Sequence, residues 1–152
     1  MEIVKIPNPL LKRRLADVAS DEIKKGTYAA LIEEMRQTMI VAKGVGLAAN
    51  QIGQDLQLFV IEKVMATENA IPDAFFNPEI TEYSREEDEM EEGCLSIPSF
   101  YHQIRRAKKI KIKALDEQGN KIKFKARGFL ARVLQHETDH LNGVTIKERA
   151  KK

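Results

Sequence analysis

The chain has 152 residues, of which 43% are hydrophobic, so it is long enough for one domain with a substantial core. Its single cysteine excludes an internal disulfide, which fits a reducing compartment, and the net charge of +2 excludes no class of partner. The sequence contains no apolar run of signal-peptide or membrane-spanning length. We therefore expect a soluble cytoplasmic protein formed by one domain, residues 1–152, without membrane contact.

A helix and two strands are predicted in the first half of the chain. Apolar residues recur at helical spacing from Thr27 to Lys43, which predicts a core-facing helix with Gly44 as its C-cap. The stretch LQLFVIEKV from Leu56 predicts a buried strand, and PEITEYS from Pro78 predicts a second, shorter strand.

The segment GVGLAANQIG, residues 44–53, is rich in glycine, but its pattern does not match a nucleotide-binding motif. It follows a helix and lacks both the P-loop lysine and the third glycine of a dinucleotide fingerprint. The glycines that flank Val45 allow close backbone approach, so either an extended peptide pairs with this edge or the segment is a plain helix-ending turn. Gln51 is either a satisfied core amide or a donor aimed at a substrate oxygen.

Charged residues are unevenly distributed in the second half. Residues 82–92 contain seven acids, whereas residues 105–127 contain ten basic residues and two acids. Within the basic segment, residues 108–126 alternate lysine with apolar side chains across an Asp-Glu-Gln-Gly-Asn turn, which predicts a hairpin with one apolar and one lysine face. The lysine face carries no aromatic residue for base stacking, so we interpret it as a solvated surface and expect no specific nucleic-acid partner.

The stretch QHETDHLNG, residues 135–143, indicates a metal site. Helical spacing before it predicts a helix from about Gly128 to Leu141. His136 and His140 are four residues apart, so on that helix they lie on the same face and can bind one metal ion. The longer protease motif needs a third histidine where this chain has Ile146, so the third ligand must come from upstream.

Two residues are candidates for that third ligand, Cys94 and His102. The stretch EGCLSIP places Cys94 in a loop or at a strand edge, where a lone cysteine is most often an inert buried residue. Two imidazoles and a thiolate, however, would leave the fourth position of a tetrahedral site open, as in catalytic metal sites. Cys94 is therefore favoured over His102, and Glu92 with Arg106 either pair behind the site or are free surface charges.

The motifs GVGLAANQ, EGCLS and QHETDH together resemble the three signature motifs of the peptide deformylase family. They occur in the same order and at comparable spacing, and the resemblance covers nearly the whole chain. It implies an α+β fold in which mixed and antiparallel strands pack around a central metal-binding HExxH helix. It also implies a metallohydrolase that removes the N-formyl group from the N-terminal formylmethionine of newly made polypeptides and releases formate.

By this resemblance, Cys94, His136 and His140 bind one divalent metal ion, natively Fe(II), with zinc, nickel or cobalt as alternatives. Glu137 is the general base for attack of metal-bound water on the formyl carbon, while the Gln51 side chain and the Leu95 backbone N–H hold the formyl oxygen. The resemblance assigns substrate binding to a further group: Gly44, Val45, Gly46, Met90, Gly93, Phe129 and Val133.

The resemblance leaves some features open. The sequence ends with VTIKERAKK, so we do not expect the long C-terminal helix that contributes to ribosome docking in most bacterial members. Short forms of this kind occur among bacteriophage-encoded members, which would act in the host cytoplasm. The sequence also allows two alternative functions. One is a zinc endoprotease with room for substrate on both sides of the scissile bond. The other is a catalytically idle peptide-binding module whose metal is structural and needs a fourth ligand, such as His102.

Overall fold

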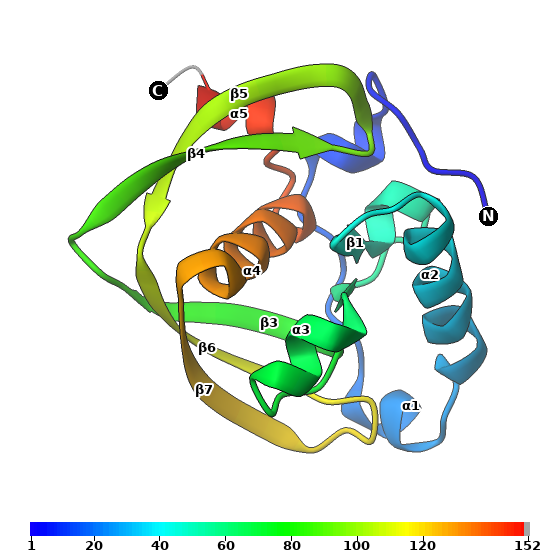
Figure 1. Ribbon diagram of the computed structural model, residues 1–152. Helices are drawn as coiled ribbons and strands as arrows, with labels where there is room; N and C mark the ends of the chain where they lie inside the picture. The colour runs from blue at the N-terminus through cyan, green and yellow to red at the C-terminus, as the bar shows by residue number, and fades with distance from the viewer. Residues whose placement is uncertain (151–152) are drawn as a thin grey trace.

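The computed structural model describes residues 1–150 (Figure 1). Two 3-10 helices span Pro9–Lys12 and Ala49–Ile52. The α-helices are α1 (Ser20–Lys24), α2 (Ala29–Val41), α3 (Lys63–Glu68), α4 (Gly128–Leu141) and α5 (Ile146–Ala150). The strands are β1 (Gly46–Ala48), β2 (Leu58–Ile61), β3 (Ala74–Tyr83), β4 (Glu87–Cys94), β5 (Ile97–Ala107), β6 (Lys109–Leu115) and β7 (Lys121–Arg127). Among the described helices, none has the length and apolar character needed to cross a membrane.

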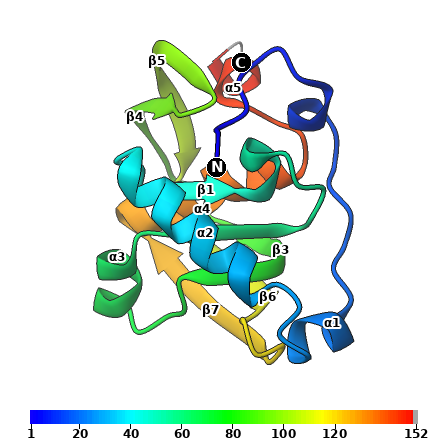
Figure 2. The same cartoon turned by 90° about the vertical axis from the view of Figure 1, so that its right-hand side faces the viewer.

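Helix α4 lies between two antiparallel sheets (Figure 1). One sheet has five strands in the order β1-β2-β3-β6-β7, and the other is the β4–β5 hairpin. Helix α2 packs against β1 and β2 (Figure 2), and α5 packs against β5. This arrangement confirms the predicted α+β fold with strands around a central helix.

The core explains why α4 holds its side chains firmly. Ten of its residues are buried, including the polar side chains of Gln135, Glu137 and His140. On the sheet beneath, the fully buried ring of Phe75 lies 5.1 Å from the Phe59 ring and 6.0 Å from the Phe124 ring, measured between centroids. A helix enclosed in this way offers few alternative rotamers to the residues that project from it.

The end of α2 differs from the prediction that Gly44 is its C-cap. Lys43 has the positive φ of 58°, and the N–H of Gly44 donates to the carbonyl of Met39 at 2.9 Å, so Lys43 is the left-handed residue that ends the helix. A Cβ atom at Gly44 would lie 2.9 Å from Leu95 Cδ1. The glycine thus packs closely against the Leu95 side chain. The predicted C-cap at Gly44 was wrong, because the C-cap is Ala42 and the left-handed residue after it is Lys43.

The strand predictions were correct in type and wrong in extent. The strand expected from Leu56 is β2, which ends at Ile61, and Lys63 already begins α3. The strand expected from Pro78 is part of β3, which begins at Ala74 and is longer than β2. Pro78 fits within it because the pairing with β6 shifts register between Phe76 and Glu79. The hairpin predicted over residues 108–126 is confirmed as β6 and β7.

The β4–β5 hairpin was not predicted, and it accounts for part of the uneven charge. Acidic residues of β4 lie opposite basic residues of β5, and acidic residues of β3 lie opposite lysines of β6. The pairs in register are Asp88 with Arg106, Glu89 with Arg105, Glu79 with Lys113, and Glu82 with Lys111. Opposite charges that face each other across paired strands stabilise the pairing. The acidic and basic segments of the sequence are therefore partners in the folded sheets.

We predict that Phe75→Ala lowers the free energy of unfolding by about 3–5 kcal/mol, because it leaves a cavity between two other aromatic rings. Urea unfolding of wild type and variant measures this loss. Thr81→Ala, at an exposed position on the same strand, serves as the control and should change stability by less than about 0.5 kcal/mol. Equal effects of the two changes would contradict the placement of Phe75 at the centre of the core.

Candidate metal centre

Three side chains from two elements converge at one point. Cys94 is the last residue of β4, while His136 and His140 project from the same face of α4. The Cys94 sulfur lies 3.2 Å from His140 Nε2, which in turn lies 3.2 Å from His136 Nε2. One donor atom from each residue lies within 4.8 Å of the other two. The structure thus brings together the three ligands that the sequence analysis proposed.

The chemistry of these atoms fits a divalent metal ion. The Nδ1 atom of His136 lies 2.9 Å from Glu92 Oε1. An ionised carboxylate only accepts hydrogen bonds, so Nδ1 carries the proton and Nε2 offers its lone pair toward Cys94 and His140. Over residues 1–150 the converging group has these three members, so a fourth coordination position is left for water or substrate.

The electrostatics around His136 also favour a cation. Burial lowers the pKa of this ring, but Cys94 and Glu92, together with the charge of Glu137, outweigh it and raise the pKa to about 10. For His140, burial and the neighbouring His136 lower the pKa well below its ordinary value. The acceptors around His136 thus stabilise positive charge, as expected at a site that binds a cation.

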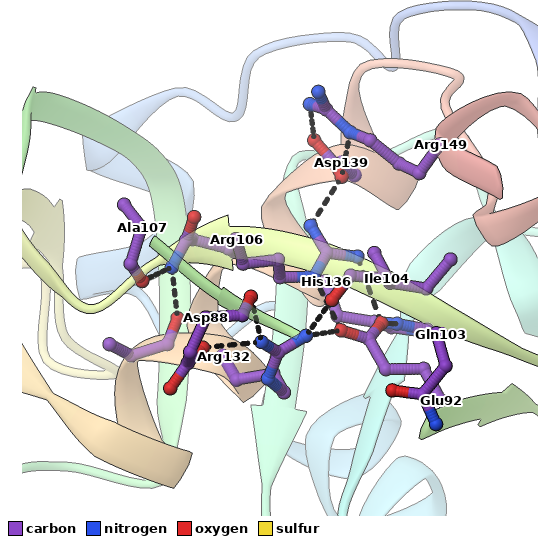
Figure 3. A network of polar contacts seen from close by, with 12 residues as sticks. Asp88, Glu92, Gln103, Ile104, Arg106, Ala107, Arg132, His136, Asp139 and Arg149 are labelled. Carbon is purple, nitrogen blue, oxygen red and sulfur yellow. Dashed lines mark hydrogen bonds and ion pairs between the residues drawn. The ribbon is translucent and has the colours of Figure 1, made fainter. Parts of the chain in front are cut away.

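Glu92 is held by two arginines behind the metal site (Figure 3). Arg106 donates to both oxygens of Glu92, at 2.6 and 2.9 Å, and Arg132 donates to Oε2 at 2.5 Å. Although burial raises the pKa of Glu92, hydrogen bonds from His136 and Arg106 outweigh it and lower the pKa to about 2. Glu92 and Arg106 therefore pair behind the site and are not free surface charges. Arg132 was not identified from the sequence.

Glu137 lies beside the ligands without joining them. It is buried, its Oε2 atom lies 4.0 Å from His136 Nε2, and its Oε1 atom has no hydrogen-bond partner among the described residues. Burial is the main cause that raises the pKa of this carboxyl to about 7. A Cβ atom at Gly46 would lie 2.5 Å from Glu137 Oε2, so only glycine lets the two elements approach this closely. The arrangement suits a group that takes up and returns a proton near neutral pH.

Gln51 is oriented from both ends of its amide. Its Oε1 atom accepts from the N–H of Ala48 at 3.0 Å, and its Nε2 atom lies 3.2 Å from Ser96 Oγ and 3.7 Å from the Cys94 sulfur. The acceptor bond fixes which end of the amide faces the site, so N–H donors point toward the metal ligands. Ser96 is fully buried and was not singled out from the sequence.

A cleft of about 330 Å³ opens in front of these residues. Gln51, Leu95 and Glu137 line it. So do all seven residues predicted to bind substrate: Gly44, Val45, Gly46, Met90, Gly93, Phe129 and Val133. Tyr101 also lines it and was missed; its ring lies against Gly93, where a Cβ atom would be 2.5 Å away. The candidate residues thus form one continuous surface.

His102 does not take part in the site. It lies on β5 with an exposed side chain, its Nδ1 atom contacts the carbonyl of Gln103 at 2.9 Å, and its ring stacks on Phe100 at 6.2 Å between centroids. Because Cys94 and not His102 completes the converging group, a fourth ligand from His102 has no support in the geometry.

We predict that Cys94→Ser lowers the metal content of the purified protein severalfold, because a hydroxyl is a poorer ligand than a thiolate for these metals. His102→Ala is the matched control, since both residues were candidates for the third ligand, and it should retain wild-type metal content. Elemental analysis after gel filtration measures both. Loss of metal from His102→Ala would instead indicate a site closed by four protein ligands.

Comparisons with known proteins agree with this geometry. A family model described as polypeptide deformylase matches residues 1–152. A peptide deformylase of Dictyoglomus turgidum is 46% identical over 151 residues, which cover 99% of this chain and 92% of that protein. One from a strain of Prochlorococcus marinus is 48% identical over 120 residues, which cover 79% of this chain and 59% of that longer protein.

A solved structure shows the same fold. The class I type b peptide deformylase from Acinetobacter baumannii, in complex with Met-Ala-Ser, superimposes with a TM-score of 0.88 at 34% identity and covers 98% of this chain and 97% of that one. The match of the family model over the whole chain, the sequence relatives and the shared fold lead to one conclusion. The chain belongs to the polypeptide deformylase family of metal-dependent hydrolases.

Proposed function

We propose that this chain removes the N-formyl group from the N-terminal formylmethionine of new polypeptides and releases formate, using the cleft in front of Cys94, His136 and His140. The observation that carries this proposal is the convergence of these three donor atoms within 4.8 Å beside the buried carboxylate of Glu137. Membership of the polypeptide deformylase family supports the reaction class.

Cys94, His136 and His140 would hold one divalent metal ion, for which we propose Fe(II), with nickel, cobalt or zinc able to take its place. When bound, such an ion acidifies a water molecule and polarises the formyl oxygen. Raw affinity at a mixed sulfur and nitrogen site favours zinc over Fe(II), so the metal supply of the cell decides the occupant. We propose the cytoplasm, where formylated chains are made, as the place of action.

Glu137 acts as the general base and then as the general acid. Its raised pKa of about 7 lets it accept a proton from the attacking water and return that proton to the amine that leaves. Its Oε1 atom has no partner among the described residues and is available for this exchange, while Gly46 leaves room for Oε2. Among the described acids that line the cleft, no other is both as buried as Glu137 and free of an arginine partner: Glu91 is exposed, and Glu92 is paired with two arginines.

Gln51 and the backbone N–H of Leu95 stabilise the negative charge that develops on the formyl oxygen. The Gln51 amide is preorganised by Ala48 and Ser96, so little reorganisation is needed during the reaction. Each such donor typically contributes about 3 kcal/mol to catalysis. A site in which both donors lie next to the metal ligands favours hydrolysis over passive peptide binding.

The methionine side chain would occupy the apolar part of the cleft, formed by Val45, Met90, Phe129 and Val133. The backbone of the substrate would pair with the sheet edge at Val45 and Gly46, where Val45 precedes β1 and Gly46 is its first residue. Binding of Met-Ala-Ser by the Acinetobacter baumannii neighbour supports a short peptide with an N-terminal methionine as the ligand of this cleft. We propose nascent formylmethionyl peptides as the substrates and residues 1–152 as one catalytic domain.

We predict that Glu137→Gln lowers kcat/KM for formate release from formyl-Met-Ala-Ser by about 10²–10⁴-fold, because the amide cannot accept the proton. Protein purified without oxygen and loaded with Ni(II) is used, and metal content is measured beside activity. Glu68→Gln, an exposed change at the end of α3, is the control and should retain activity. Full activity of Glu137→Gln would show that Glu137 is not the general base. Absence of formate release by the metal-loaded wild type would contradict the proposed function.

We predict that Gly46→Ala lowers kcat/KM by about 10²-fold with unchanged metal content, because the added methyl group displaces the Glu137 carboxyl. The double variant Gly46→Ala/Glu137→Gln should be no less active than Glu137→Gln alone, since both changes affect the same group. Additive losses would show that Gly46 acts through some other contact.

A further inference from the structure

We propose that Arg149, on the C-terminal helix α5, is a positioning residue of the metal centre. It acts on the ligand His136 through a chain of charged side chains that runs from α5 to the site (Figure 3). The inference rests on the metal ligands assigned under the proposed function. It adds a residue that contacts neither substrate nor metal ligand and that comes from the last described helix.

The first link joins α5 to α4. Arg149 donates two hydrogen bonds to Asp139, from Nε to Oδ2 at 2.9 Å and from Nη2 to Oδ1 at 2.7 Å. Arg106, on β5, donates from Nη1 to Oδ2 of the same carboxylate at 2.9 Å. Asp139 is therefore shared between a guanidinium group at the surface and one in the interior. Paired bonds of this kind fix geometry as well as charge.

The second link joins β5 to the metal ligand. Arg106 donates to both oxygens of Glu92, and Glu92 Oε1 receives Arg106 Nη2 at 2.9 Å as well as His136 Nδ1 at 2.9 Å. One oxygen atom thus connects the guanidinium group to the metal-ligating ring. A shift of Arg106 must move the acceptor that sets the orientation of His136.

The balance of charges makes the series of ion pairs between Arg149 and His136 sensitive to the loss of Arg149. Arg106, Arg132 and Arg149 face three carboxylates, those of Asp88, Glu92 and Asp139. The Arg106 side chain is only 3% exposed, so water screens its contacts little. Without Arg149, Arg106 is the one cation among the described residues that still contacts the carboxylate of Asp139. Arg106 is then drawn away from Glu92, and the hold on His136 weakens.

Helix α5 has contacts to the rest of the fold besides the Arg149 head group. Ile146 is buried against Ile97 and Ile104, and the N–H of Thr145 donates to Glu148 at 2.9 Å ahead of the helix. The Arg149 fork itself donates to Asp139. Lys147, on the same helix, offers a matched control because its ammonium group lies over the Phe100 ring at 5.6 Å and leads to no metal ligand.

The test measures the affinity of the protein for Co(II) by competition with a chelator, with no use of activity. Arg149→Met should weaken Co(II) binding by about threefold to tenfold, less than the roughly 10–100-fold loss seen when a direct partner of a ligand is removed, because Arg149 acts through Asp139, Arg106 and Glu92. Lys147→Met should remain within about twofold of wild type. Arg149→Lys keeps the charge but loses the fork, so it should fall between wild type and Arg149→Met, and it replaces that variant if Arg149→Met does not fold.

A double-variant cycle separates positioning from general stabilisation. In the Asp139→Asn background, Arg149→Met should have no further effect on Co(II) affinity, because the link is already broken. The proposal would be overturned if Arg149→Met, or Arg149→Lys in its place, bound Co(II) as tightly as wild type. If that variant also lost equal urea stability in the chelated and the Co(II)-loaded protein, Arg149 would have a structural role only. Because formate release is not measured, failure of the deformylase assignment would appear separately and would not alter this result.

Discussion

The contact between the Glu92 carboxylate and the His136 ring is the interaction on which the metal centre depends. A buried carboxylate stays ionised only if cations compensate its lost hydration, and Arg106 and Arg132 supply that compensation here. Its negative charge then fixes the proton of His136 on Nδ1 and leaves Nε2 for the metal. Removing either arginine would do more than break an ion pair, since it would also release the ring that the carboxylate orients.

The fold places this contact by packing one helix between two sheets. Helix α4 carries both histidines and Glu137, and the β4–β5 hairpin carries Cys94 and Glu92, so the site exists only where the hairpin folds over the helix (Figure 1). Opposite charges across the β4–β5 pairing hold the hairpin together. The 3-10 helix before β2 then supplies Gln51. Three segments distant in sequence thus meet at the site: α4 with His136, Glu137 and His140, β4 with Cys94 and Glu92, and the 3-10 helix with Gln51.

The sequence predicted the parts of this site that have a local signal. Helix α4 followed from periodicity and a C-terminal stop, and the pairing of its histidines followed from their spacing. Residues 87–94 gave no strand signal, because their acids lack the alternation and β-branched content typical of strands, so the β4–β5 hairpin was missed. Arg132 and Arg149 could not be assigned either, since their partners lie far away in the sequence and such pairing has no periodic pattern.

The most direct test of the account is a crystal structure of the metal-loaded protein with anomalous diffraction at the metal edge. We expect one metal ion bound by the Cys94 sulfur and the Nε2 atoms of His136 and His140, with Glu92 on the Nδ1 side of His136 and at least one coordination position open to the cleft. A metal bound through Nδ1 of His136, or enclosed by a fourth protein ligand, would contradict it.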